Sequence, residues 1–138
     1  MNFTRIKYEN LNAKQQEIFN FQRVAALLAG YGFNCIKLAD DWQSADFLAY
    51  HIDGKVTYRV QLKSRLTIDR NYVGRDLCLA FPHGKSWYMV EHDHLVKLVG
   101  EKTKWLNSNS WLDKGHYHTA KPNKILVEAL HSYVLSDA

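Results

Sequence analysis

The stretch ADFLAYHIDGKVTYRVQLKSR, from Ala45 to Arg65, decides the fold. Two strand-like runs flank Asp53-Gly54, a dipeptide that is typical of a two-residue type I′ hairpin turn. A loop of two residues fixes the register, so the residue numbers of cross-strand partners add up to a constant. Ile52 then faces Lys55, and the pairing continues outward from them.

The same counting brings three polar side chains together. It places Asp46 opposite Gln61, and Lys63 follows on the same face, one diagonal step beyond Gln61. Directly opposed side chains have Cβ atoms about 5 Å apart, close enough for both tips to reach one metal ion. The hairpin therefore predicts a carboxylate, an amide oxygen and an ammonium side by side.

The pattern of Asp46, Gln61 and Lys63 resembles the PD-(D/E)XK nuclease superfamily, over roughly residues 12 to 100. The resemblance implies an α/β, restriction-endonuclease-like core: a helix, a three-stranded meander, then further strands with flanking helices around a mixed sheet. It also implies that these three residues are catalytic. Ala45 stands where the motif has proline, and Gln61 replaces the usual acid.

Hydrolysis of a phosphodiester by such a site needs a divalent ion held by oxygen ligands. The resemblance implies Mg²⁺ or Mn²⁺, held by the Asp46 carboxylate, the Gln61 side-chain carbonyl and the backbone carbonyl of Leu62. Lys63 would place a positive charge beside the phosphate and the attacking water. Because Gln61 is neutral, the predicted cage has one negative charge fewer than the usual site.

The range from Asn12 to Ala29 predicts the first helix, because Asn12 and Gln15 form a capping-box pattern and glycines follow the last apolar residue. Glu17 heads the apolar stripe of this helix. It is either a charge favoured by the helix dipole or a further acid of the site, and both interpretations stay open. The resemblance favours the second, since several superfamily members carry a glutamate there.

Alternation, turn residues and caps predict the other elements. Asp40 and Asp41 fall in a predicted loop, and Asp46 is preferred as the motif acid because a strand follows it directly. The predicted elements are a strand at 33–38, a loop at 39–44, strands at 76–81 and 86–91, and helices at 92–99 and 121–134.

The segment from Ser64 to Arg75 interleaves basic and aromatic side chains. Such a mixture suits phosphate contacts and stacking on sugars or bases. It is also what a solvated loop looks like, and the two interpretations stay open. The candidate nucleic-acid contacts are Arg65, Arg70, Tyr72 and Arg75.

Composition sets the limits of these interpretations. A chain of 138 residues predicts one domain over residues 1–138. A net charge of +4 and a pI near 9.0 permit a polyanionic partner. Cys35 and Cys78 make no redox or metal spacing, and no signal peptide is visible, so we expect a cytoplasmic protein. The longest aliphatic run, Val24 to Ala29, is too short for a membrane span.

We therefore expect a metal-dependent endonuclease that hydrolyses DNA phosphodiester bonds. One alternative is a catalytically weak or inactive nuclease-fold protein that binds nucleic acid. Another is a small globular protein whose polar strand face is only solvated. Because cutting both strands of DNA needs two sites, the first expectation is compatible with a symmetric homodimer.

Overall fold

The computed structural model describes residues 1–137 and builds them around a six-stranded sheet. The strand order is β1-β2-β3-β5-β6-β8, and the strands β4 and β7 pair separately. The strands are β1 (Phe33–Trp42), β2 (Ala45–His51), β3 (Thr57–Leu62), β4 (Leu66–Asp69), β5 (Leu77–His83), β6 (Ser86–Glu91), β7 (His116–Thr119) and β8 (Val134–Leu135). Only the β3–β5 pair of the large sheet is parallel, so the sheet is mixed.

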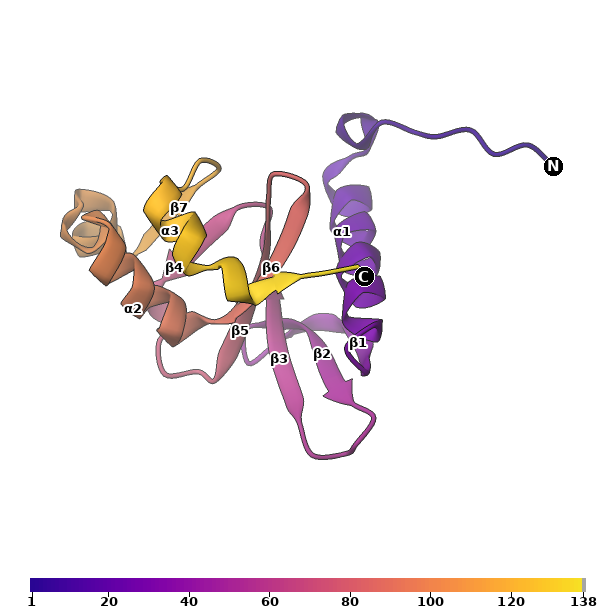
Figure 1. Ribbon diagram of the computed structural model, residues 1–138, viewed down its shortest axis with the longest axis horizontal. Coiled ribbons are helices and arrows are strands. Elements are labelled where there is room, and N and C mark those ends of the chain that lie inside the picture. The colour runs from indigo at the N-terminus through magenta and orange to yellow at the C-terminus, as the bar shows by residue number, and fades with distance from the viewer. Residues whose placement is uncertain (138) are drawn as a thin grey trace.

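Helices cover both faces of this sheet (Figure 1). The helix α1 (Ala13–Ala29) lies on one face, and α2 (His92–Lys102) and α3 (Lys124–Ala129) lie on the other. Short 3₁₀ turns occur at Tyr8–Asn10, Arg70–Tyr72, Trp105–Asn107 and His131–Tyr133, and a π turn at Ser110–Lys114. The order of helix, antiparallel meander β1-β2-β3, further strands and flanking helices confirms the predicted α/β class and the order of its core.

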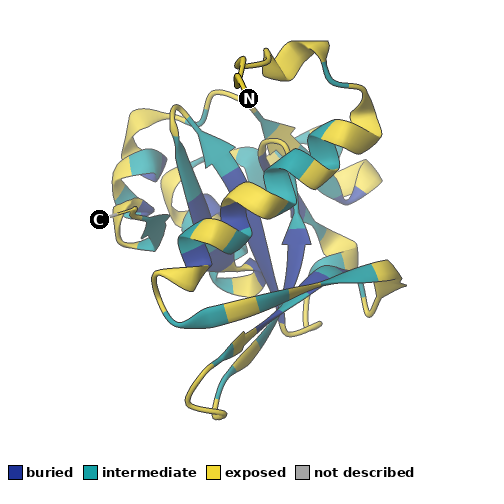
Figure 2. Cartoon of the chain, turned by 90° about the vertical axis from the view of Figure 1, so that its right-hand side faces the viewer, coloured by how far each residue is buried: buried dark blue, intermediate teal, exposed yellow. Residues whose placement is uncertain are grey.

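The first helix begins as the sequence predicts. The Asn12 side chain accepts the Gln15 N–H at 2.8 Å, and the Gln15 side chain accepts the Asn12 N–H at 3.0 Å. Val24 and Leu28 of this helix are buried against the sheet, where they join Phe47 and other residues of a shared core. Figure 2 shows that the face of the helix turned away from the sheet is largely exposed. Since the opposite helix face is exposed, packing rather than propensity alone holds α1.

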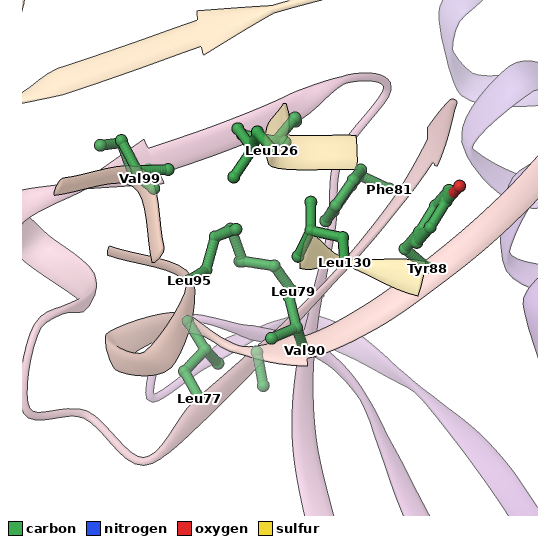
Figure 3. Close-up of a cluster of buried hydrophobic side chains, with 12 residues drawn as sticks. Leu77, Leu79, Phe81, Tyr88, Val90, Leu95, Val99, Leu126 and Leu130 are labelled. Carbon is green, nitrogen blue, oxygen red and sulfur yellow. The ribbon is translucent and has the colours of Figure 1, made fainter. Parts of the chain in front are cut away.

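A second core fills the space between the sheet and α2 and α3 (Figure 3). The rings of Phe81 and Tyr88 stack there with centroids 5.6 Å apart. Five consecutive residues of β5, from Leu77 to Phe81, are buried, because both faces of this central strand are covered. The labelled members are Leu77, Leu79, Phe81, Tyr88, Val90, Leu95, Val99, Leu126 and Leu130.

The β2–β3 hairpin has the predicted register but a different turn. Phe47 pairs with Val60 and Tyr50 with Thr57, so partner numbers add up to 107 as expected. The prediction that Ile52 faces Lys55 is wrong, because both lie in a four-residue loop. The loop closes through the Gly54 N–H bonded to the His51 carbonyl, and the ladder resumes with the His51 N–H on Val56. A four-residue loop of this kind preserves the same sum.

The two-residue turn lies elsewhere, between β1 and β2. Trp42 pairs with Ala45, and the two residues between them, Gln43 and Ser44, have φ of 52° and 67°. Positive φ at both central positions is the geometry of a type I′ turn. The predicted loop at 39–44 is therefore wrong, since β1 continues to Trp42 through an irregularity after Lys37.

Other element boundaries also differ from the prediction. The segment from Ser64 to Arg75 contains β4, whose Leu66 and Ile68 are buried, because β7 supplies a partner from far along the chain. The buried His92 accepts the Asp69 N–H at 3.0 Å and ties β4 to α2. Among the other elements, β5 extends to His83, α2 extends to Lys102, and the closing helix ends at Ala129.

No helix within the described range is long and apolar enough to cross a membrane. The expectation of one domain over residues 1–138 stays a prediction, and its last residue, Ala138, lies outside the described residues. Cys78 is buried and Cys35 half-buried, both as free thiols.

The two turns lead to a stability prediction. Ser44→Gly should stabilise the protein by roughly 0.5–1 kcal/mol, because glycine adopts positive φ without steric cost. This figure is net of the larger conformational entropy that glycine has in the unfolded chain. Gly54→Ala should destabilise it by about 1 kcal/mol, because φ is 75° there although the added Cβ meets no atom within 4 Å. Urea unfolding measures both free energies. Equal stability of parent and Ser44→Gly would contradict the type I′ turn.

Candidate functional site

The candidate site is centred on the point where β2 and β3 separate. The last regular pair of this ladder is Phe47 with Val60. Beyond it, the Asp46 carboxylate accepts the Leu62 N–H at 2.8 Å, in place of a backbone acceptor. The N–H of Lys63 points the other way, to the Ala80 carbonyl at 2.9 Å. Because the N–H and C=O of a strand residue point to the same neighbour, the Leu62 carbonyl is on the side of Asp46.

A second carboxylate, that of Asp41, lies beside Asp46. Because Trp42 pairs with Ala45 across a two-residue turn, one further step puts Asp41 opposite Asp46. Burial raises the pKa of Asp46 to about 6, and the Asp41 carboxylate adds to this increase. The hydrogen bond from Leu62 and the charge of Lys37 act in the opposite direction. The two carboxylates repel each other when both are ionised, and a bound cation would offset this repulsion.

Glu17 is connected to this pair through Lys37. The Lys37 Nζ lies 3.1 Å from the Glu17 Oε1, and Lys14 is a weaker second partner at 3.7 Å. The hydrogen bond from Lys37 is the main reason why the pKa of Glu17 is lowered. Glu17 also borders a hollow of about 200 Å³ together with Leu62 and Lys63. It therefore lies near the motif, but its charge is already paired.

Gln61 is 9% exposed and lies in β3 beside Leu79 of β5. Its amide makes no hydrogen bond to any residue of the described chain, and none joins it to the Asp46 carboxylate. No side-chain N or O atom among the described residues is both buried and unpaired, so the Gln61 amide reaches solvent and is open to a ligand. The predicted convergence of Asp46, Gln61 and Lys63 on one side of the hairpin stays a prediction.

Lys63 extends from the end of β3 toward the second core. Its Nζ lies 5.5 Å from the centroid of the Tyr72 ring. Tyr72 is held in turn by an edge contact to His92, with centroids 5.4 Å apart. In residues 1–137, Lys63 has no carboxylate partner within ion-pair distance. Its charge is oriented by an aromatic ring without being neutralised.

The four predicted nucleic-acid contacts occupy unlike positions. Arg65 is exposed and so is Arg75, whose carbonyl accepts a hydrogen bond from Arg59 at 2.6 Å. Arg70 donates to the carbonyls of Trp111 and Leu112 and so fastens the π turn. The Tyr72 ring is engaged by its two neighbours. Arg70 and Tyr72 thus have roles within the fold, and contact with nucleic acid by any of the four stays a prediction.

The oxygen atoms gathered here are of the kind that Mg²⁺ prefers. Within the described residues, no three His, Cys, Asp or Glu side chains are grouped as a metal site requires. A divalent ion would therefore rest on the two carboxylates, the Leu62 carbonyl and the Gln61 amide, with water and substrate completing its shell. Two carboxylates close enough for Asp41 to raise the pKa of Asp46, with the Leu62 carbonyl beside them, fit such an ion.

Sequence reasoning missed Asp41 and Lys37. The sequence predicts a loop at Asp41, because Gln43-Ser44 carries none of the residues that type I′ turns favour. Once that turn is known, the counting applied to the other hairpin finds Asp41 at once. Lys37 gave no comparable signal, since its link to Glu17 depends on how α1 crosses β1.

Comparisons with known proteins give one distant structural likeness. The fold is similar to that of a bacterial homing endonuclease, I-Ssp6803I, with 15% sequence identity and a TM-score of 0.49. The likeness covers 82% of this chain and 78% of the other chain. No protein-family model matches the chain, and no curated protein does. A likeness this distant says nothing of the chemistry at the site.

The raised pKa of Asp46 predicts how stability depends on pH without divalent ions. Between the unfolded pKa of 3.8 and about 6, the folded protein holds a proton that the unfolded chain has lost. The free energy of unfolding should therefore fall as pH rises through this range. Asp46→Asn should remove that fall, since its amide oxygen still accepts the Leu62 N–H. Urea unfolding in chelator at several pH values measures the difference.

Asp53 provides a control of opposite sign. The Lys55 N–H is the main reason why its pKa is lowered, so its contribution to stability is present above pH 3.8 and lost on acidification. Asp53→Asn should lose stability relative to the parent at neutral pH. If the free energy of unfolding depends on pH in the same way in Asp46→Asn and in the parent, the pKa of the Asp46 carboxyl is not raised.

Proposed function

We propose that the protein is a metal-dependent endonuclease that hydrolyses phosphodiester bonds in DNA. The observation that carries this proposal is the hydrogen bond from the Leu62 N–H to Asp46. It holds a half-buried carboxylate against the backbone of β3, the strand that directly precedes Lys63. A phosphodiester requires oxygen ligands for a cation and positive charge for the phosphate. The acidic pair would supply the first, and Lys63, the residue after Leu62, would supply the second.

Each residue would have a distinct task. Asp46 and Asp41 would hold the ion with their carboxylates, helped by the Leu62 carbonyl and the Gln61 amide. A divalent ion bound there supplies charge stabilisation to the phosphate and lowers the pKa of water. Lys63 would orient the attacking water and stabilise negative charge on the phosphate oxygens in the transition state. The Glu17–Lys37 pair would fix the position of a positive charge beside Asp46.

The alternative is a nuclease-fold protein that binds nucleic acid without cutting it. The neutral Gln61 and the absence, within the described residues, of three grouped acidic, His or Cys side chains favour this second candidate. Ion-dependent nicking separates the two, because only the hydrolase cuts DNA. The basic net charge of +4 and the exposed Arg65 and Arg75 would serve both. A homodimer would supply the two sites that a double-strand cut needs.

The first functional prediction compares Asp46→Asn with Lys63→Ala on supercoiled plasmid. With Mg²⁺ or Mn²⁺ the parent should nick the plasmid, and chelator should stop it. Asp46→Asn should abolish both ion binding and nicking, because it removes the negative charge of the half-buried ligand. Lys63→Ala should leave ion binding unchanged and slow nicking by roughly 100-fold or more, as expected of a group that acts in the transition state.

Calorimetric titration of Mn²⁺ into the same preparations provides the control on binding. A parent that binds Mn²⁺ and DNA but never nicks would favour the binding protein over the hydrolase. An Asp46→Asn variant that binds the ion and cuts like the parent would contradict the assigned ligand.

A second prediction concerns the number of negative charges among the side chains that would hold the ion. Gln61→Glu should tighten Mn²⁺ binding to the free protein, because it adds one negative charge to the cage. Asp41→Asn should weaken it, because it removes one. Asp40→Asn, one residue away from the pair, is the matched control and should bind like the parent. Calorimetry would measure all three, and unchanged affinity in Gln61→Glu would remove that side chain from the ligand set.

A further inference from the structure

A polar pocket of about 380 Å³ lies directly beyond Lys63, on the small sheet formed by β4 and β7. Figure 1 shows these two strands side by side, apart from the large sheet. Thr67 pairs with His118 and Asp69 with His116, so all four side chains share one face. Leu66 and Ile68 occupy the other face, in the second core. The alternation of β4 thus separates a buried apolar side from a polar side that lines the pocket.

The two imidazoles are arranged as a pair. The rings of His116 and His118 are nearly parallel, at 9°, with centroids 6.3 Å apart. Neither ring has a hydrogen-bond or ion-pair partner within residues 1–137. Each neutral imidazole carries one N–H donor. Two such donors on adjacent same-face positions of a strand are therefore available to one ligand.

The charge around the pocket favours an anion. Lys63 and Arg65 both line it, and neither has a carboxylate partner in the part of the chain that the structure describes. Asp69 contributes the opposing charge, but its carboxylate already accepts the Asn71 N–H at 2.9 Å. Arginine and imidazole N–H groups suit phosphate oxygens. A cation would meet two positive side chains there.

The pocket also adjoins the candidate site. Lys63 and Ser64 line both this pocket and the hollow that contains Glu17. A DNA strand with one phosphate at Lys63 would therefore bring a neighbouring phosphate to the histidines. Ser64 lines both hollows, and its hydroxyl is a further donor for a phosphate oxygen.

We propose that His116, His118 and Arg65 form a subsite for a non-scissile backbone phosphate of the DNA strand, next to the phosphate that is cut. This inference rests on the proposed function, because it takes DNA as the ligand. It extends that function by giving the strand a path, from Lys63 across Ser64 onto the face of β4 and β7. The subsite binds backbone without reading bases.

The test measures DNA binding in chelator, where no cutting occurs. The probe is a 20-base-pair duplex labelled with a fluorophore, and anisotropy gives its affinity at several salt concentrations. The double variant His116→Asn, His118→Asn should bind about tenfold more weakly, as expected for a lost hydrogen bond to a charged group. The double variant His83→Asn, His131→Asn, with both changes outside the pocket, is the matched control and should bind like the parent.

A modified duplex tests the same contact without changing the protein. Replacing single phosphates by uncharged methylphosphonates, one position at a time, should weaken parent binding at a position adjacent to the cut. The double variant at 116 and 118 should bind the duplex modified at that position as tightly as the unmodified duplex, because its contact to this phosphate is already absent. Arg65→Ala should also lower the slope of log affinity against log salt by about one.

The outcomes separate this subsite from the hydrolysis. If the double variant at 116 and 118 binds DNA like the parent and no methylphosphonate distinguishes them, the subsite is wrong even where the parent cuts DNA. If the double variant binds weakly but no divalent ion supports cutting, the hydrolysis is wrong and the subsite stands. Should the double variant fail to fold, the methylphosphonate series on the parent with Arg65→Ala decides in the same two directions.

Discussion

The hydrogen bond between the Leu62 N–H and the Asp46 carboxylate is the constraint on which the site depends. Where β2 turns away from β3, the Leu62 N–H loses its ladder partner, and a buried donor without an acceptor costs free energy. The carboxylate supplies the acceptor. The same bond lowers the pKa of Asp46, whereas burial of the carboxylate raises it and prevails. The pKa of this acid is therefore set at the point where the backbone of β3 needs an acceptor.

The parallel pair β3–β5 gives this point its rigidity. Val60 pairs with Cys78 and Leu62 with Ala80, so β3 is clamped between an antiparallel and a parallel neighbour. Since β5 is buried on both faces, any shift of β3 would disturb both cores. Polar groups at the open end of β3 are held by a strand that cannot move independently of the core, and this precision is what catalytic groups require.

The features that could be predicted from the sequence are those that depend on residues close together in the chain. The capping box of Asn12 and Gln15 and the register of the second hairpin were predictable, and the register survived an incorrect turn because both loops preserve the same sum. The Gln43–Ser44 turn could not be predicted, since neither residue prefers positive φ. Without that turn, the position of Asp41 opposite Asp46 could not be predicted either. The pairing of β4 with β7 joins segments far apart in the sequence, and no local preference encodes it.

The strict alternation along β3 has a consequence for how this chain can change over time. Val60 faces α1, whereas Gln61 lies beside Leu79 of the other core, so neighbouring positions belong to different chemical environments. Inserting or deleting one residue within β3 would exchange them, placing polar groups in a core and a valine at the site. Length variation among descendants should therefore collect in the loop around Gly54 and at the β5–β6 turn, where gaps leave the alternation intact.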